Sequence, residues 1–317
     1  MSLPTPQMKN TIIVGHSPGG LGNILVQLAH ITAFCMEYEK TLYAPTFTRV
    51  SNLFENGGGV RARIYPPKLD KKHQNIPLVK YLKGFSRKLS REIGTSDKTV
   101  ATSFGSILGR INIKGMEDTI DLETLEFKKF AESHRFTVLS GWRFRAPNLV
   151  IKHADAIRKL FAIQQKYDLE ATQLIKPVKD LNRTLVGIHI RRGDYQGSEF
   201  FWALENYIFL MQSIKDLVEN PVFVVCSNED IYDQIPKSLD CLFPKGSAII
   251  DLLCMSKCNL IAAPPSTFSG WASFIQKVPR YKIISLENPP TVDQFTIDRE
   301  LDGHCVGPVF VKIKDIM

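Results

Sequence analysis

Apolar and β-branched runs alternate with helical repeats along the chain, and this alternation predicts an α/β fold. The run Thr11–Val14 predicts a strand. The glycine-rich turn after it leads into an apolar repeat that predicts a helix over 21–38, and a second strand is expected at 41–44. The middle of the chain, about 54–140, has no clear period. A further helix is expected at 152–167 and a linker at 180–183.

The pattern is clearest in the second half of the chain. The expected strands are 185–190, 222–226, 259–263 and 281–285. The expected helices between them are 203–217, 251–257 and 268–276, with a short helix from Glu229. Because strands and helices alternate, the sheet should be parallel and doubly wound. We expect two α/β domains, over residues 1–180 and 181–317.

Composition restricts the class of protein. Of the 317 residues, 44% are hydrophobic and 23% are charged, which is typical of a globular protein. No apolar run is long enough for a membrane span, and Met1–Asn10 lacks the pattern of a signal peptide, so we expect a cytoplasmic protein.

The six cysteines are expected to be reduced core thiols. Cys254 and Cys258 are four apart, but no second Cys/His pair stands near them, so no metal site is expected.

The net charge of +8 is concentrated in one segment. Residues 68–98 contain nine Lys or Arg and three Asp or Glu, a local charge of +6, and the rest of the chain carries +2. Residues 78–91 predict a basic amphipathic helix. Three interpretations are open: a solvated surface helix, a peripheral contact with the anionic inner face of a membrane, and nucleic-acid binding. The last is disfavoured because no aromatic-rich basic strand or groove-reading motif is present, so no nucleic-acid partner is expected.

Polar clusters follow three successive strands of the second half, where ligands bind in doubly wound sheets. The first is His189–Tyr195, which reads His-Ile-Arg-Arg-Gly-Asp-Tyr. Strand alternation places His189 and Arg191 on one side and Ile190 and Arg192 on the other. A guanidinium fork binds phosphate oxygens and stays charged, so this cluster suits a pyrophosphate. The alternative is an Arg–Asp salt bridge at the surface.

The other two clusters support the same site. In Ser227–Asp230, a carboxylate could accept hydrogen bonds from a guanine base, although these residues could instead cap a helix. In Pro264–Trp271, Ser266 is a good N-cap, and a helix start binds anions, although capping without a ligand is also possible. Since the three clusters follow neighbouring strands of one sheet, together they predict a nucleotide-diphosphate site.

The turn Gly19–Asn23 does not predict a dinucleotide enzyme. Its spacing is not G-x-G-x-x-G, and Ala44 and Pro45 stand at the end of the next strand, where an acidic partner for a ribose would be needed. An NAD-dependent enzyme is therefore disfavoured.

These stretches resemble the α-1,2-fucosyltransferase family and the wider fucosyltransferase superfamily. The resemblance covers most of the chain and is carried by Gly19–Asn23, Gly141-Trp142, His189–Tyr195, Ser227–Asp230, and Asp251–Cys258 with Ser266–Ser269. It implies a GT-B fold, in which an acceptor-side domain (1–180) and a nucleotide-sugar domain (181–317), both Rossmann-like with parallel sheets, face a cleft. It further implies an inverting, metal-independent enzyme that transfers L-fucose from GDP-fucose, its donor, to a glycan hydroxyl.

The resemblance also implies roles for particular residues. Arg191 would bind the β-phosphate. From its position beside the arginines, which would lower its pKa, we expect Asp194 to orient Arg191 or Arg192 more readily than to act as a base; other carboxylates such as Glu199 stay open as the base. The implied catalytic residues are Arg191 and Asp194. The implied donor-binding residues are Gly20, Gly22, Asn23, His189, Arg191, Arg192, Glu229, Asp230, Ser266, Thr267, Phe268 and Ser269.

The chain departs from the family pattern at two positions. Pro265 stands where the family usually has Asn, and Gly270 precedes Trp271 where the family has Trp-Trp. These departures keep two alternatives open: a transferase that uses another nucleotide sugar, and a non-catalytic protein that binds nucleotide sugars or glycans.

Overall fold

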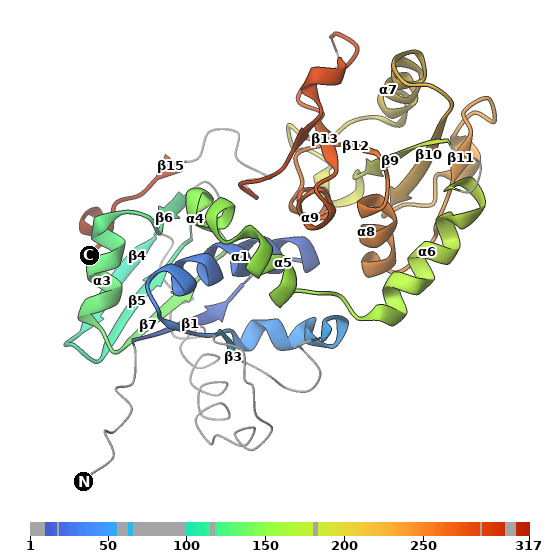
Figure 1. Ribbon diagram of the computed structural model, residues 1–317. Helices are drawn as coiled ribbons and strands as arrows, with labels where there is room; N and C mark the ends of the chain where they lie inside the picture. Colours follow the sequence, from blue (N-terminus) through green and yellow to red (C-terminus); the bar gives the residue numbers. More distant parts are fainter. Residues whose placement is uncertain are drawn as a thin grey trace. The chain divides into compact units, whose positions relative to one another are not determined.

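The computed structural model describes residues 10–17, 19–55, 63–65, 99–114, 118–179, 183–285, 287–301 and 309–317. The basic helix expected at 78–91, and Cys305, lie outside these ranges. The chain forms two compact units (Figure 1): unit 1 comprises Met1–Ala162 and Val306–Met317, and unit 2 comprises Ile163–Cys305.

Unit 1 contains a six-stranded sheet in the order β3-β2-β1-β7-β5-β4. Its strands are β1 (Thr11–His16), β2 (Thr41–Tyr43), β3 (Arg63–Tyr65), β4 (Val100–Phe104), β5 (Leu108–Asn112) and β7 (Phe136–Ser140). The four inner strands run parallel, whereas β3 and β4 pair antiparallel at the two edges. A second, parallel sheet joins β6 (Asp118–Asp121), β8 (Phe144–Arg145) and β15 (Val309–Phe310).

The main helix of unit 1 is α1 (Leu21–Glu37), which is buried along most of its length and packs against α4 (Pro147–Lys152) and α5 (Ala154–Leu160). The other helices are α3 (Leu125–Ser133), α4 (Pro147–Lys152) and α5 (Ala154–Leu160), with 3-10 turns at Pro45–Arg49, Ser51–Leu53 and Ile313–Asp315. The single helix expected at 152–167 is therefore wrong. One reason is that His153, between α4 and α5, pairs with Glu37 of α1, and Phe161, after α5, is buried against Phe47 and Phe54.

Unit 2 confirms the expected doubly wound sheet. Its strands are β9 (Thr184–Ile190), β10 (Pro221–Ser227), β11 (Cys241–Leu242), β12 (Leu260–Ala263), β13 (Pro279–Lys282) and β14 (Thr296–Ile297). The order is β11-β10-β9-β12-β13-β14, and all neighbours are parallel except β13 and β14.

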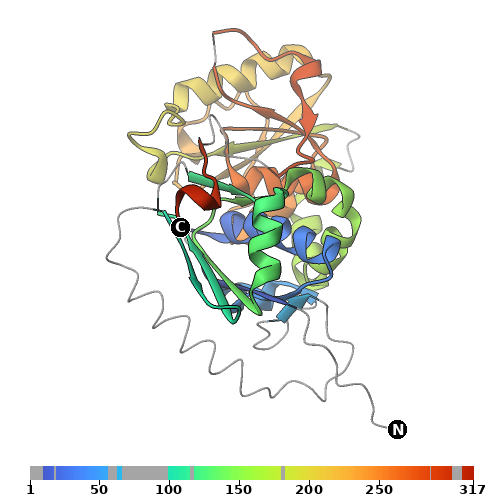
Figure 2. The same cartoon turned by 90° about the vertical axis from the view of Figure 1, so that its left-hand side faces the viewer.

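Helices cover both faces of this sheet (Figures 1 and 2). Helix α7 (Leu204–Leu217) lies on one face, and α8 (Ala248–Ser256) and α9 (Thr267–Gln276) lie on the other. The short helix expected from Glu229 is a 3-10 turn at Tyr232–Gln234; further 3-10 turns lie at Gly193–Tyr195 and Val292–Gln294. Ile188 and Ile190 of β9 pack with Tyr207 and Leu210 of α7, so His189 faces the side of α9.

The units divide after residue 162, not after residue 180 as expected. Residues 165–179 form α6 (Gln165–Lys179), which packs along α8 and so belongs to unit 2. The end of the chain returns to unit 1, because β15 pairs with β6 and the amide of Ala101 donates to the carbonyl of Ile316 at 2.8 Å. Packing between distant segments thus sets the boundary.

The cysteines in the described part of the chain are free thiols. Four are buried and Cys241 is half-buried. Burial raises the pKa of Cys254 to about 12, as expected for a core thiol that is not a nucleophile. None of the helices in the described ranges is long and apolar enough to cross a bilayer.

Candidate active site

The end of β9 presents a guanidinium–carboxylate pair. Arg191 follows the strand, and its Nε and Nη2 donate to the two carboxylate oxygens of Asp194 at 2.7 and 2.6 Å. The Arg191 hydrogen bonds hold the pKa of Asp194 below its usual value. Both side chains are partly exposed, so the pair can meet a ligand while Asp194 stays negatively charged.

The first cluster lies against the second. Nε of Arg192 is 3.4 Å from a carboxylate oxygen of Glu229. A Cβ atom added at Gly193 would lie only 2.9 Å from Nδ2 of Asn228, so glycine allows the two loops to approach closely. Asp230 is exposed. Glu229 and Asp230 were both expected to bind the guanine base, and Glu229 already forms an ion pair with Arg192.

The first cluster also lies against the third. Tyr195 donates from its hydroxyl to the carbonyl of Pro265 at 3.0 Å. The rings of His189 and Phe268 are 5.2 Å apart between centroids. All three polar strand ends predicted from the sequence therefore meet at one edge of the unit 2 sheet.

His189 is a buried, neutral imidazole in this cluster. Its side chain is only 4% exposed, and burial, followed by the charges of Arg191 and Arg280, lowers its pKa to about 3. Nδ1 is buried and has no hydrogen-bond partner among the described residues. A neutral ring with an unpaired nitrogen can bind a polar group of a ligand, but it cannot supply positive charge.

Helix α9 begins at the third cluster. The Ser266 hydroxyl accepts a hydrogen bond from the amide of Phe268 at 3.2 Å, as an N-cap does. Thr267 is largely buried. Ser269 is fully buried, and its hydroxyl contacts the Ser266 carbonyl and a guanidinium nitrogen of Arg280. The resemblance implied that Ser269 holds phosphate, whereas the structure places its hydroxyl inside the unit, behind the helix start.

Two functional candidates in unit 2 were not predicted. Arg280 of β13 forms a buried ion pair with Asp298 behind the start of α9. Asp251 lies in the first turn of α8, where burial raises the pKa of its carboxyl to about 6 and the amide of Gly246 donates to it at 3.3 Å. A strongly shifted carboxyl at the ligand-binding edge is a candidate for function.

The glycine-rich loop lies in unit 1, between β1 and α1. Gly19 has a φ of +95°, and a Cβ atom there would lie 2.2 Å from Nδ2 of Asn23, so only glycine fits. The guanidinium of Arg49 donates to the carbonyl of Gly19 at 3.4 Å. Gly20 is exposed with open space around it, and Gly22 is buried in α1. The donor contacts implied for Gly20, Gly22 and Asn23 stay predictions.

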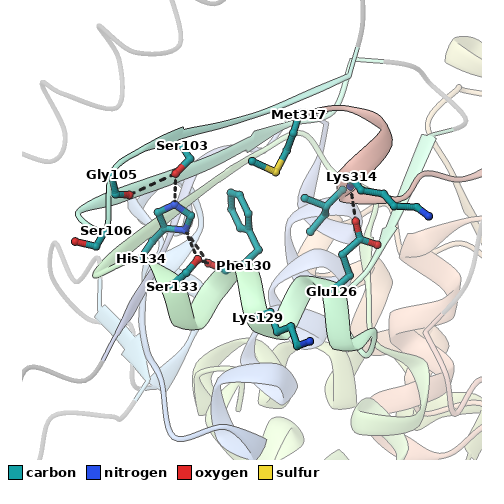
Figure 3. Close-up of a pocket in the computed structure, with 11 residues that line it drawn as sticks. Ser103, Gly105, Ser106, Glu126, Lys129, Phe130, Ser133, His134, Lys314 and Met317 are labelled. Atoms are coloured by element: carbon teal, nitrogen blue, oxygen red, sulfur yellow. Dashed lines mark hydrogen bonds between the residues drawn. The ribbon is translucent and has the colours of Figure 1, made fainter.

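A cavity of about 560 Å³ lies elsewhere in unit 1, between the β4–β5 hairpin, α3 and the last residues (Figure 3). Nδ1 of His134 donates a hydrogen bond to the carbonyl of Phe130 at 2.7 Å, and Nε2 lies 2.6 Å from the hydroxyl of Ser103. The hydroxyl of Ser103 also donates to the carbonyl of Gly105 at 3.4 Å. None of the residues predicted for the site lines this cavity.

Within the described ranges, no group of three or more His, Cys, Asp or Glu side chains is arranged to hold a metal ion.

Several solved structures have a similar fold. A mutant of FUT1 from Arabidopsis thaliana in complex with GDP is 13% identical, with a TM-score of 0.51 over 92% of this chain and 74% of that one. The fucosyltransferase NodZ from Bradyrhizobium is 16% identical, with a TM-score of 0.51 over 89% and 97%. NodZ α-1,6-fucosyltransferase co-crystallised with GDP is 14% identical, with a TM-score of 0.50 over 89% and 96%. These likenesses show the fold, which is that of GT-B enzymes.

A comparison with curated protein sequences found no significant match. The profile of glycosyl transferase family 11, in contrast, matches residues 116–297, which is more than half of the chain and includes all three strand ends of the site. The chain belongs to glycosyl transferase family 11 and is a glycosyltransferase.

Proposed function

We propose that the protein transfers L-fucose from GDP-fucose to a hydroxyl of a carbohydrate acceptor, forming an α-1,2 linkage with inversion at the anomeric carbon. The observation that carries this proposal is the meeting of three polar strand ends around Arg191 and the start of α9. The resemblance of His189–Tyr195 to α-1,2-fucosyltransferases supports fucose and the linkage. Two of the structures with a similar fold contain GDP, which supports the nucleotide.

The charges at this edge suit a diphosphate leaving group. As the acceptor oxygen attacks, the bond from the anomeric carbon to the β-phosphate oxygen breaks, and GDP leaves with the electron pair. Arg191, Arg192 and the amides at the start of α9 would offset the negative charge that develops there. We also propose that these groups suffice without a divalent ion, which could otherwise supply the same stabilisation.

A carboxylate is proposed to read the guanine base through its N–H donors. Glu229 is partly engaged with Arg192, and Asp230 is exposed. Asp251 fits this role better, because its half-buried carboxyl would regain hydrogen bonds lost on burial if a base donated to it. We therefore add Asp251 to the two carboxylates predicted from the sequence.

Asp194 is proposed to position Arg191 and not to accept the proton of the acceptor. Its low pKa makes it a weak base, because a carboxylate that is stabilised by two charge-assisted hydrogen bonds holds a proton poorly. A transition state with much positive charge on the sugar needs little help from a base.

A screen of nucleotide sugars tests the proposal and separates it from its alternatives. GDP-fucose should raise the melting temperature, and with a glycan acceptor it should release GDP and give an α-1,2-linked product by NMR. A shift and transfer with a different nucleotide sugar would assign another donor. A shift with GDP-fucose but neither hydrolysis nor transfer would indicate a binding protein. No shift with any nucleotide sugar would refute the proposal.

A further inference from the structure

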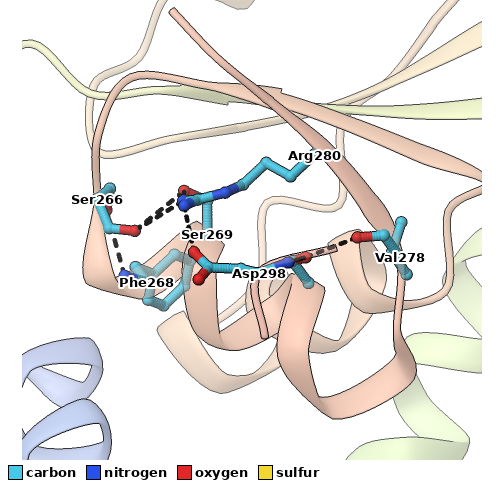
Figure 4. A network of polar contacts seen from close by, with 7 residues as sticks. Ser266, Phe268, Ser269, Val278, Arg280 and Asp298 are labelled. Carbon is cyan, nitrogen blue, oxygen red and sulfur yellow. Dashed lines mark hydrogen bonds and ion pairs between the residues drawn. The ribbon is translucent and has the colours of Figure 1, made fainter. Parts of the chain in front are cut away.

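A buried ion pair lies behind the first turn of α9. Arg280 of β13 is 1% exposed and Asp298, which follows β14, is 7% exposed. Nη2 of Arg280 donates to a carboxylate oxygen of Asp298. Nη1 donates to the carbonyl of Ser266 at 3.0 Å and to the hydroxyl of Ser269 at 2.8 Å. Figure 4 shows the guanidinium reaching all three partners.

The helix does not need Arg280 in order to begin. Ser266 already caps it, and the carbonyl of Ser266 already accepts the amide of Gly270 at 3.0 Å. Arg280 adds a tie between this turn and the sheet, because it lies in β13 opposite Ile261 of β12. The guanidinium of Arg280 thus fixes the start of α9 relative to β12, the strand that precedes this helix in the chain.

Gly270 makes room for the ion pair. A Cβ atom at this position would lie 2.9 Å from the Asp298 carboxylate and 3.5 Å from Nη1 of Arg280. Gly270 is also one of the two positions at which the chain departs from the family pattern. The Arg280–Asp298 pair occupies the space that a side chain at position 270 would fill. This explains why glycine stands here, where the family usually has tryptophan.

The charge of Arg280 reaches the site at the end of β9. After burial and the charge of Arg191, it contributes to the lowered pKa of His189. Arg280 and Tyr195 also affect each other's pKa values. The ion pair is therefore close to the groups that form the site, although it is buried beneath them.

We propose that Arg280, held by Asp298 and accommodated by Gly270, is a positioning residue that fixes the first turn of α9 for the β-phosphate of a nucleoside diphosphate donor. The inference rests on the proposed function for its ligand. Arg280 acts through Ser266 and Ser269 and contacts no atom of the donor. Small misplacements of binding groups cost much affinity and rate, so a tie of this kind matters to function.

The test removes both charges together. Arg280→Met alone would leave the Asp298 carboxylate buried without its partner and could unfold the protein, whereas apolar pairs often replace buried ion pairs without loss of stability. The variant is therefore Arg280→Met with Asp298→Leu. Calorimetry compares its affinity for GDP and for GMP, which lacks the β-phosphate. We expect affinity for GDP to fall about tenfold or more and affinity for GMP to stay within about twofold.

A second ion pair of unit 2, which is partly exposed, provides a control for the removal of two opposite charges. Lys257, which follows α8, and Asp168 of α6 are 2.7 Å apart, and Lys257→Met with Asp168→Leu also removes two opposite charges. This control should keep the wild-type ratio of GDP to GMP affinity. A merely structural role of Arg280 would lower both affinities together or neither.

Hydrogen exchange tests the tie without any nucleotide. The amides of the first turn of α9 should exchange faster in the Arg280–Asp298 double variant than in the wild type, and at the wild-type rate in the control. If the double variant keeps both the GDP preference and the slow exchange, the inference is wrong. If the wild-type protein binds no GDP, the proposed function and the ligand role of Arg280 fail together, and exchange still decides whether Arg280 fixes the turn.

Discussion

Arg191 donates two hydrogen bonds to Asp194, from Nε at 2.7 Å and from Nη2 at 2.6 Å. The carboxylate holds the edge of the guanidinium formed by Nε and Nη2, and we propose that Nη1 binds an oxygen of the β-phosphate. The same contact lowers the pKa of Asp194. A single pair thus orients the cation and keeps its partner ionised, and the predictions below begin from it.

Replacing Arg191 should impair catalysis even when the charge is kept. Lysine cannot reproduce the two-point contact with Asp194, so Arg191→Lys should be nearly as damaging as Arg191→Ala. For a group that stabilises the leaving phosphate, the expected loss in kcat is about 10²–10³. Steady-state kinetics with saturating GDP-fucose measures it. Normal turnover by both variants would show that Arg191 does not bind the leaving group.

The role of Asp194 can be separated from that of a base by a pH profile. Because the Arg191 hydrogen bonds hold the pKa of Asp194 below its usual value, Asp194 should stay ionised throughout the profile. Asp194→Asn should lower kcat/KM, since Arg191 loses its orientation. An acid limb of the wild-type profile near neutral pH, where activity falls as the pH drops, should be present at the same pH in the variant. Disappearance of such an acid limb in the variant would instead identify Asp194 as the base.

His189 should make stability depend on pH. Its pKa is about 3 in the folded protein, well below the value of an unfolded histidine, so between the two the unfolded state binds more protons and stability falls as the pH drops. Urea midpoints at about pH 7.5 and about pH 5 should differ more in the wild type than in His189→Gln. Equal differences in the two proteins would mean that His189 titrates normally.

Asp251 should have the opposite dependence. Its folded pKa of about 6 exceeds the unfolded value, so the folded state binds more protons between them and stability falls as the pH rises through this window. Asp251→Asn should raise the melting temperature at about pH 7.5 and have little effect at about pH 4. The same variant should bind GDP more weakly if Asp251 reads the base. Unchanged GDP affinity would return that role to Glu229 or Asp230.

A membrane contact through the basic segment stays a prediction from the sequence, as does a cytoplasmic location. If residues 78–91 bind an anionic bilayer, the protein should float with vesicles containing phosphatidylserine and not with neutral vesicles. Replacing Lys80, Lys83, Arg87 and Lys88 by Gln should abolish flotation while GDP affinity stays unchanged. If the wild type floats with neither kind of vesicle, a solvated surface helix is the better interpretation.

The sequence predicted the parts of the site that local patterns encode. The strand run 185–190 and the apolar repeats around it identified a parallel sheet, and a parallel sheet brings the carboxyl ends of its strands together. This rule predicts that the first and third clusters lie close together. It does not predict which residues touch, such as His189 with Phe268 and Tyr195 with Pro265.

Contacts between distant segments could not be predicted in this way. Arg280 and Asp298 are separated by a turn and an edge strand, and no period or motif marks them as partners. The position of α6 in unit 2 depends on packing against α8, which an amphipathic pattern does not specify. Ser269 matches the family motif for phosphate binding, yet its buried hydroxyl accepts a hydrogen bond from Arg280. The departure from the family pattern at Gly270 is explained only by the ion pair beside it, which no local pattern predicts.

A crystal structure with bound GDP tests the central claim most directly. The account predicts that the β-phosphate lies at Nη1 of Arg191 and at the amides that begin α9, with the guanine near Asp251, Glu229 or Asp230. A nucleotide bound at another edge of unit 2, or a diphosphate that touches neither Arg191 nor the start of α9, would contradict it.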